Sequence, residues 1–302
     1  MTELGRESKS LDLSWLARLG PARFFPRGSA EGPSSGRYTG SRRGQAGEFV
    51  DRRAYSPGDD HRRIDWKFYA RSDRWTVREE REESHLRAVL LIDVSRSMTF
   101  SGAHRNPKSH FAMHLSAGLA HVFRRCQESF GWGFFEQTLL SYQPPRRGDE
   151  MWSRFLFSLQ NIPIGHKTSF AHALGSFVQR ARGRGAVIVV SDFLGPLEDV
   201  FGGFRLLTTA WRDVCALQIL DPVELDLSLG GGAGRIEDLE SSDSLNVDLD
   251  TVHEAYRSKM ENRQLSLTRG LAALSVDYHL CRTDRPVDAE LSAFLRRRAG
   301  RR

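Results

Sequence analysis

The sequence contains few cysteines and no long apolar run. Its three cysteines, Cys126, Cys215 and Cys281, are far apart and form no CxxC pair, which is typical of small core residues in a reducing compartment. The longest apolar runs, such as residues 88–92, are much shorter than the roughly 20 residues that span a bilayer. Residues 1–10 lack the apolar core of a secretory signal. We therefore expect a cytoplasmic protein without a membrane span.

Motifs of nucleotide-binding and hydrolytic enzymes are also missing. The sequence has no Walker A motif and no GxSxG nucleophile elbow, so any ATP chemistry would belong to a partner protein. The glycine-rich segment LGGGAG at 229–234 lacks the GxGxxG order and does not lie between a strand and a helix. We interpret it as a turn rather than a dinucleotide site.

The excess of positive charge is concentrated at one end of the chain. The net charge is +6, and without the five arginines of the last segment, Arg296, Arg297, Arg298, Arg301 and Arg302, it falls by five to +1. Such a basic segment is most often a solvated tail, although it can also contact nucleic acid or an anionic lipid surface. Nucleic-acid binding through these arginines therefore stays open as an alternative function.

The composition changes along the chain and indicates successive segments. Residues 1–36 hold a short helical stretch and a Gly/Pro/Ser-rich linker, and we expect them to form a tail. Residues 37–85 are rich in aromatic residues and in charges of both signs, and we expect them to pack on the main domain as an extension. Residues 86–295 form that domain, with an acidic, glycine-rich hairpin or loop inserted at about 221–250, and 296–302 form a basic tail.

From residue 86 onward, short apolar segments alternate with amphipathic ones. The expected strands are 87–93, 130–136, 186–191, 213–220 and 276–281. The expected helices are about 108–126, 150–159, 169–182, 197–208, 252–274 and 288–298. Because the strands are almost continuously apolar and alternate with helices, the sequence predicts an α/β fold. Its doubly wound, mostly parallel sheet would be covered by helices on both faces.

Oxygen-bearing side chains follow two of these strands and precede one helix. The run AVLLIDVSRSM places Asp93, Ser95 and Ser97 at alternate positions after a strand. Asp192 ends the strand AVIVVSD, and Thr168 lies in the loop that opens a helix. Ligands of open α/β sheets bind outside the carboxyl ends of the strands. We therefore expect these five side chains to converge on one site.

The chemistry of these side chains points to a metal. Two carboxylates and three hydroxyls form a hard oxygen site, which suits Mg²⁺, Mn²⁺ or Ca²⁺ rather than zinc. Because only two ligands are acids, a bound ion would accept a further oxygen, most naturally from an acidic side chain of a partner. The leading hypothesis is a non-enzymatic, metal-dependent binding site. A metal-assisted hydrolase at the same site stays open as an alternative, although the five ligand candidates leave no general base to spare.

The same motifs carry a resemblance to known proteins. DVSRSM, TSFAHAL and VVSDF resemble, in order, the three loops of the metal-ion-dependent adhesion site (MIDAS) of the von Willebrand factor A fold. The resemblance implies that Asp93, Ser95 and Ser97 are ligands in the first loop, Thr168 in the second and Asp192 in the third. Upstream, YSPGDDHRRIDWKFYARSDRW is similar to the hallmark of domain-of-unknown-function family 58 (DUF58), and DPVELDL, RIEDLE and VDYHLCRTDRP also fit that family.

This resemblance implies a kind of partner. Proteins of the family commonly accompany MoxR-type AAA+ ATPases and act as adaptors in the maturation or remodelling of other proteins. The partner implied here is therefore a MoxR-type AAA+ ATPase, or a client protein that presents an acidic residue to Mg²⁺, Mn²⁺ or Ca²⁺. Many relatives carry membrane helices, which this sequence lacks.

The hallmark segment supplies a second candidate surface. It begins with a turn of the Pro-Gly-Asp-Asp type. Arg62, Arg63, Trp66 and Arg71 then combine arginine with an aromatic residue, a composition that is enriched at interface hot spots. We expect either a partner-binding surface or a charged brace that folds against the main domain, and the brace is the simpler interpretation.

Overall fold

The computed structural model describes the chain in two compact units. The described residues are 11–27, 51–56, 59, 61, 64–79, 86–102, 106–162, 165, 168–181, 183–227, 233–237 and 244–300. The described residues from 51 to 79 belong to a small unit, and the remainder belong to a large one.

A six-stranded sheet forms the centre of the large unit, in the order β10-β7-β6-β3-β4-β5. The strands are β3 (Arg87–Asp93), β4 (Ser129–Phe135), β5 (Leu139–Arg146), β6 (Gly183–Ser191), β7 (Trp211–Leu220) and β10 (Asp277–Arg282). All neighbouring pairs are parallel except β4 and β5, which are antiparallel. This confirms the predicted doubly wound, mostly parallel sheet of the von Willebrand factor A type.

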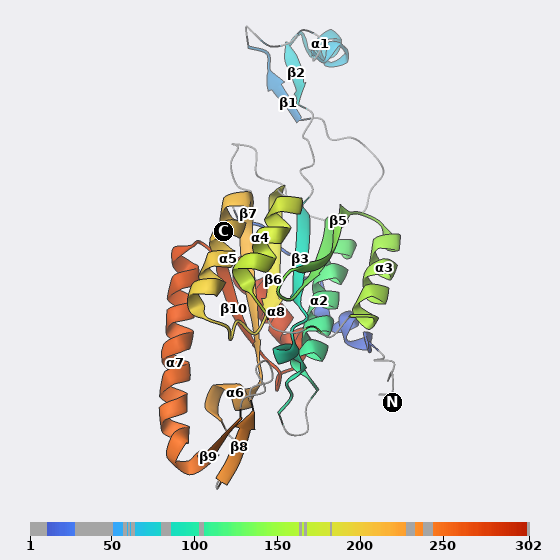
Figure 1. The fold of residues 1–302 in the computed structure, drawn as a ribbon. Helices are drawn as coiled ribbons and strands as arrows, with labels where there is room; N and C mark the ends of the chain where they lie inside the picture. The colour runs from blue at the N-terminus through green and yellow to red at the C-terminus, as the bar shows by residue number, and fades with distance from the viewer. Residues whose placement is uncertain are drawn as a thin grey trace. The chain divides into compact units, whose positions relative to one another are not determined.

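Helices cover both faces of this sheet (Figure 1). One face packs against the 3-10 helix η1 (Ser14–Leu19) and against α2 (Lys108–Arg125), α3 (Asp149–Gln160) and α8 (Val287–Ala299). The other face packs against α4 (Phe170–Arg180), α5 (Leu197–Ala210) and α7 (Leu249–Ala273).

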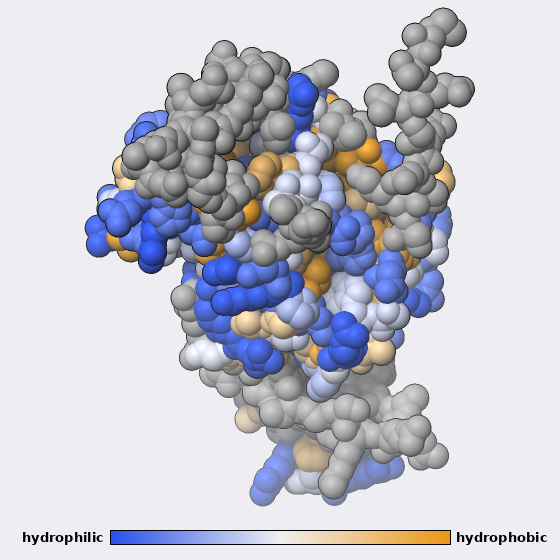
Figure 2. All heavy atoms as spheres, turned by 90° about the horizontal axis from the view of Figure 1, so that it is seen from below, coloured by the Kyte–Doolittle hydropathy of each residue, from blue (hydrophilic) through white to orange (hydrophobic). Residues whose placement is uncertain are grey.

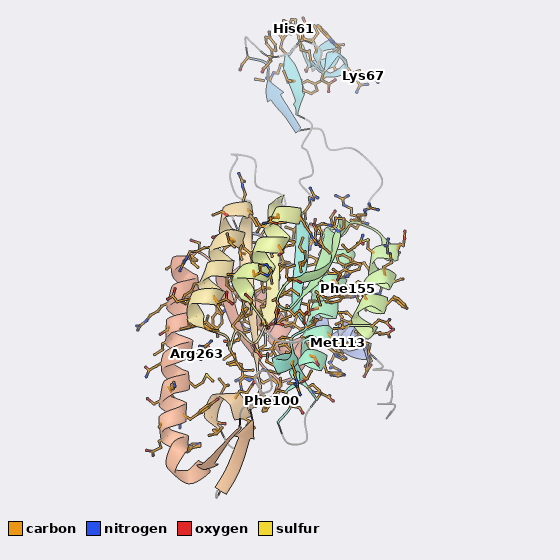
Figure 3. The ribbon with its side chains drawn as sticks, viewed as in Figure 1. His61, Lys67, Phe100, Met113, Phe155 and Arg263 are labelled. Carbon is orange, nitrogen blue, oxygen red and sulfur yellow. The ribbon has the colours of Figure 1, made fainter. Side chains whose placement is uncertain are left out.

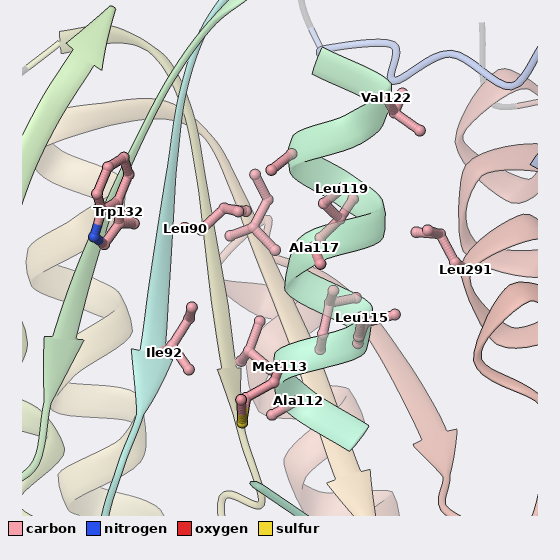
Figure 4. Packing of buried hydrophobic residues seen from close by; sticks show 14 of the residues in the cluster. Leu90, Ile92, Ala112, Met113, Leu115, Ala117, Leu119, Val122, Trp132 and Leu291 are labelled. Atoms are coloured by element: carbon pink, nitrogen blue, oxygen red, sulfur yellow. The ribbon is translucent and has the colours of Figure 1, made fainter. Parts of the chain in front are cut away.

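The alternation of side chains along β3 creates two separate cores. Leu90 and Ile92 belong to the cluster beneath α2, whereas Val89 and Leu91 belong to the cluster beneath α4 and α5. All four side chains are almost completely buried, and each contributes about 1.5–3 kcal/mol of hydrophobic stabilisation. Figure 4 shows Leu90 and Ile92 facing Leu119 and other apolar residues of α2. Strand β3 is thus held rigidly from both sides, up to the point where its polar residues begin.

Both ends of the large unit differ from the sequence-based prediction. Trp15, Leu16, Leu19 and Phe24 are buried in the core beneath α2 and α8, so this part of 1–36 is not a tail. Likewise, α8 continues to Ala299 and includes the first part of the segment 296–302, which was expected to be a basic tail.

The arginines of α8 explain the second difference. The Arg298 side chain is buried between Asp213 and Asp277, and its Nη1 donates to Asp277 Oδ2 at 2.8 Å. Arg297 Nη2 donates to Asp277 Oδ1 at 3.2 Å. Two buried acids therefore fix the end of α8. These two arginines serve the fold rather than a solvated tail, while Arg301 and Arg302 lie outside the described residues.

The insertion expected at about 221–250 contains a short helix and a hairpin. Helix α6 (Pro222–Asp226) begins with a capping box in which Asp221 accepts a hydrogen bond from Val223 N at 3.0 Å. The antiparallel strands β8 (Ala233–Glu237) and β9 (Ser244–Asp248) follow, which confirms the hairpin. In Figure 1, α6 and this hairpin lie at the end of the sheet where α2 begins.

The small unit is an antiparallel pair of strands with one helix. Strands β1 (Asp51–Ala54) and β2 (Thr76–Glu79) pair with each other, and α1 (Trp66–Ser72) lies between them in sequence. Asp65 caps α1 by accepting a hydrogen bond from Phe68 N at 3.1 Å.

Candidate metal centre

The candidate site lies at the topological switch point of the sheet, between β3 and β6. Strands β3 and β6 are neighbours, but the chain leaves β3 toward β4 on one side and leaves β6 toward β7 on the other. Ligands of doubly wound sheets bind outside the carboxyl ends of the strands at such a switch point. Asp93 ends β3 and Asp192 directly follows β6.

Asp93 is a buried carboxylate whose described hydrogen-bond partners are neutral. It is 2% exposed. Its Oδ1 accepts a hydrogen bond from Ser95 N at 2.8 Å, and its Oδ2 accepts one from Ser191 Oγ at 2.6 Å. Among the described residues, no lysine, arginine or histidine forms an ion pair with it. Within the described part of the chain, Asp93 therefore has no cationic side chain as a partner; His166 and Lys167, next to Thr168, lie outside that part.

The environment disfavours that charge. Burial raises the pKa of Asp93 to about 7, the nearby charge of Asp192 adds to this, and the hydrogen bonds from Ser191 and Ser95 oppose it. A carboxylate in this state gains free energy when a cation binds beside it. A buried carboxylate with a raised pKa is typical of functional sites.

The hydroxyls of Ser191 and Thr168 lie next to the Asp93 carboxylate, and those of Ser95 and Ser97 lie next to each other. The Ser95 and Ser97 Oγ atoms are 3.1 Å apart, because both residues lie at the start of the 3-10 helix η3 (Arg96–Thr99) that follows β3. Thr168 Oγ1 lies 3.4 Å and 3.5 Å from the two carboxylate oxygens of Asp93. Thr168 and Asp93, which are 75 residues apart in the sequence, therefore lie side by side.

Asp192 belongs to the same site but is already paired. Its Oδ2 accepts a hydrogen bond from Lys108 Nζ at 2.7 Å, and its Oδ1 accepts one from Leu194 N at 3.1 Å. Burial raises the pKa of Asp192, but Lys108 and the Ser97 hydroxyl lower it by more, so that the net pKa lies below its ordinary value. The two acids thus differ: Asp192 is a stable anion, and Asp93 is not.

The loop that carries Asp192 is held in an unusual backbone conformation. Phe193 has a φ of 51°, in the left-handed region that bulky residues rarely adopt. Its buried ring packs between Phe170 and Phe204, and its carbonyl oxygen accepts a hydrogen bond from Arg263 Nη2 at 2.7 Å. Figure 3 shows Arg263 on α7. These contacts hold Phe193 in its strained backbone conformation, directly after Asp192. Backbone strain of this kind clusters at functional sites.

Sequence reasoning missed three residues of this site. Ser191 precedes Asp192 and was taken only as part of a strand, although the sequence VVSD places its hydroxyl beside the acid. Lys108 follows an Asn-Pro pair and has the local pattern of an exposed helix start. Arg263 lies on α7, far from the site in sequence. For Lys108 and Arg263, no local pattern could have signalled the contact.

The five predicted ligands therefore fit a divalent cation. They are all oxygen donors, they lie after β3, after β6 and in the loop before α4, and one of them, Asp93, is a buried carboxylate with no ion-pair partner among the described residues. A second group of metal-type side chains, His279, Cys281 and Glu290, has ligand atoms within 4.8 Å of one another. Glu290, its one carboxylate, pairs with Arg285 at 3.3 Å, whereas the oxygen site holds, besides the paired Asp192, a second carboxylate, Asp93, with no ion-pair partner among the described residues, and we therefore take the oxygen site as the candidate.

The second predicted surface lies in the small unit. Trp66 is 55% exposed and Trp75 is 47% exposed, and their rings meet edge to face with centroids 5.9 Å apart. Arg71 is also exposed on α1. These residues form an open aromatic and basic surface. The predicted residues Arg62 and Arg63 lie outside the described residues.

Comparison with known proteins adds the family. Residues 51–266 match the family model "Protein of unknown function DUF58". The chain belongs to this family. DUF58 relatives include the uncharacterized proteins Rv1480 of Mycobacterium tuberculosis (strain ATCC 25618 / H37Rv) and Mb1516 of Mycobacterium bovis (strain ATCC BAA-935 / AF2122/97). Each is 25% identical over 269 residues, which is 88% of this chain and 84% of the relative.

Solved structures were matched as well. The chain is similar to the conserved hypothetical protein BatB from Bacteroides thetaiotaomicron, with a TM-score of 0.43, 13% identity and coverage of 71% of this chain and 99% of the other. An aerotolerance-related membrane protein from Bacteroides fragilis gives a TM-score of 0.44 with the same identity and coverage. Within the described part of this chain, no helix has the length and apolar character of a membrane span.

Proposed function

We propose that this DUF58 protein is a metal-dependent protein-binding module whose metal receives an acidic side chain from a partner. The observation that carries the proposal is the pairing state of Asp93. It is buried, it has no described counterion, and hydroxyl donors surround it. A carboxylate in such a position is stabilised by a cation more than by any other neighbour.

Each residue of the site has a distinct part in this proposal. Asp93, Ser95 and Ser97 form the base of the site on one rigid loop. Thr168 approaches from a second loop and would join the ligands when a partner binds. Asp192 would act directly or through a water molecule. A bound Mg²⁺ would supply an open coordination position with strong affinity for a carboxylate oxygen.

The surface around the site favours a polar partner. Figure 2 views the molecule from the side on which α6 and the β8–β9 hairpin lie, and hydrophilic residues cover much of the described surface there. Small hydrophobic patches lie between them. We propose a MoxR-type AAA+ ATPase, or a client of such an ATPase, as the partner that presents an Asp or Glu. The absence of a Walker A motif in this chain is consistent with ATP hydrolysis by that partner.

A binding role is also preferred over hydrolysis. A hydrolase would need a general base beside the site. Two acids on the α6 side of the site are already engaged, since Glu224 pairs with Lys108 at 2.6 Å and Asp221 caps α6. The proposed nucleic-acid alternative is weakened as well, because Arg297 and Arg298 are held by Asp277.

The proposal is tested by capture of partners from native cell extract with the purified full chain. We expect a protein to be retained in Mg²⁺ and released by EDTA, and we expect Asp93→Ala to retain none of it. Glu150→Ala, which removes an exposed carboxylate on α3, is the matched control and should behave as the wild type. A partner that stays bound in EDTA, or to Asp93→Ala, would contradict the proposal and would direct attention to the surface of Trp66 and Trp75.

A further inference from the structure

Lys108 has an environment that is rare for lysine. Its side chain is completely buried, although lysine is almost never buried unless it is paired. Its Nζ donates to Asp192 Oδ2 at 2.7 Å and to Glu224 Oε1 at 2.6 Å. A single ammonium group thus bridges the proposed metal site and the first turn of α6.

Both ends of this bridge are fixed by the fold. Lys108 is the first residue of α2, and its backbone N–H donates to Phe100 O at 2.9 Å in the loop that follows η3. Glu224 is held by the capping box of α6, in which its Oε2 accepts a hydrogen bond from Asp221 N at 2.9 Å. The ammonium group is thus held between two fixed carboxylates, Asp192 and Glu224.

The two acids of the site consequently differ in charge compensation. Asp93 receives hydrogen bonds only from neutral groups among the described residues, whereas Asp192 is neutralised by the ammonium of Lys108. A dication at this site would therefore meet one uncompensated carboxylate and three neutral hydroxyls. It would also be repelled by a positive charge on the far side of Asp192.

We propose that Lys108 is a built-in counter-cation that limits the affinity of the site for metal and holds Asp192 Oδ2 away from direct coordination. This inference rests on the proposed function, since it concerns the same metal. A site that is short of negative charge binds its metal weakly until a partner adds a carboxylate. Metal and partner then raise each other's affinity by the same factor, because the coupling between two ligands is reciprocal. Lys108 would thus make metal binding conditional on the partner.

Because Lys108 and Glu224 carry opposite charges, the direction in which each substitution changes the metal affinity tests the inference. Lys108→Met removes the positive charge with little change in side-chain length, and Glu224→Gln removes a negative charge with almost no change in shape. If the pair acts electrostatically on the metal, the two substitutions change metal affinity in opposite directions. If the pair only supports the structure, both substitutions weaken binding.

The experiment titrates the full chain with Mn²⁺ and follows the signal of free Mn²⁺ by electron paramagnetic resonance. We expect Lys108→Met to bind Mn²⁺ roughly tenfold or more tightly than the wild type, and Glu224→Gln to bind it several-fold more weakly. The double variant Lys108→Met/Glu224→Gln, which restores the net charge, should lie between them. Thermal unfolding of each variant without metal confirms that the compared proteins are folded.

The outcomes separate this inference from the function on which it rests. If Lys108→Met binds Mn²⁺ no more tightly than the wild type while it is folded, the counter-cation role is wrong. If Lys108→Met does not fold, Glu224→Gln decides, because unchanged or tighter binding by that variant overturns the inference. If the wild type and Asp93→Ala bind Mn²⁺ equally, the metal site itself is wrong, and the proposed function fails with it.

Discussion

Asp93 is destabilised by the environment that suits it to bind a cation. Its carboxylate is buried and close to Asp192, and both features raise its pKa. The fold tolerates this because Leu90, Ile92 and their neighbours hold β3 between two cores. The buried charge of Asp93 thus destabilises the end of the strand, and a bound metal would offset this cost.

This balance predicts an unusual effect of Asp93→Asn. Without metal, at pH 8, we expect the free energy of unfolding of the variant, measured in urea, to exceed that of the wild type by about 1 kcal/mol, because the buried charge of Asp93 is gone. With about 10 mM MgCl₂, the wild type should gain stability and the variant should gain none. A variant that is less stable without metal, or that still responds to Mg²⁺, would contradict this description of Asp93.

The sequence indicates which oxygen-bearing side chains follow the two neighbouring strands, but it does not indicate the charged side chains around them. Asp93, Ser95 and Ser97 are visible because a strand end and alternate spacing bring them together within one loop. Lys108 is not visible, because its position beside Asp192 depends on the packing of α2 against a strand that lies far along the chain. Long-range charge pairs leave no local pattern, and here they decide the electrostatics of the site.

At the scale of elements, the end of α8 shows how a basic sequence becomes a structural feature. Arg298 is buried between Asp213 and Asp277, and its Nη2 also donates to Phe25 O at 2.8 Å. One guanidinium therefore joins β7, β10, α8 and the N-terminal segment. The sequence indicates the helix but not this role, because the two acids lie in other elements.

The stability of the fold should depend strongly on this guanidinium. Arg298→Met leaves two buried acids without their cation, and we expect a loss of about 3–5 kcal/mol in the free energy of unfolding, measured in urea. Arg296→Met, on the exposed side of the same helix turn, should change it by less than about 0.5 kcal/mol. Equal effects of the two substitutions would show that the ion pairs of Arg298 do not stabilise the fold.

Strand β5 shows a different limit of sequence reasoning. The segment LLSYQPPR forms an antiparallel edge strand, and it was not predicted. Its residues alternate weakly between buried and exposed, and it contains Pro144 and Pro145, which are tolerated only at a sheet edge. The central strands were predicted because both of their faces are buried. An edge strand with one solvated face lacks that signal.

At the scale of the whole molecule, the candidate metal site and the ion pairs of Arg298 with Asp213 and Asp277 lie at opposite ends of the sheet strands. Asp213 is aligned with Ala186, which is aligned with Ala88 near the start of β3, whereas Asp93 ends that strand. The Arg298 ion pairs thus lie at the end of the sheet opposite to Asp93. The residues of the candidate site can therefore change without loss of the Arg298 ion pairs.

This separation predicts additive behaviour. Arg298→Lys, which keeps one cation but loses the guanidinium fork, should lower the free energy of unfolding. The stabilisation by Mg²⁺ should remain within about 0.5 kcal/mol of the wild-type value. Urea unfolding of both proteins, with and without Mg²⁺, provides the four values that are needed. A changed response to Mg²⁺ would mean that the two edges are coupled through the sheet.

The central claim is that a divalent cation binds among Asp93, Ser95, Ser97, Thr168 and Asp192. The most direct measurement is anomalous diffraction from crystals of the full chain grown with Mn²⁺. The account predicts a peak at roughly 2.0–2.3 Å from the hydroxyls of Ser95 and Ser97, as expected for a hard cation with oxygen ligands. A structure in Mn²⁺ with no peak there, or with its peak among His279, Cys281 and Glu290, would contradict the account.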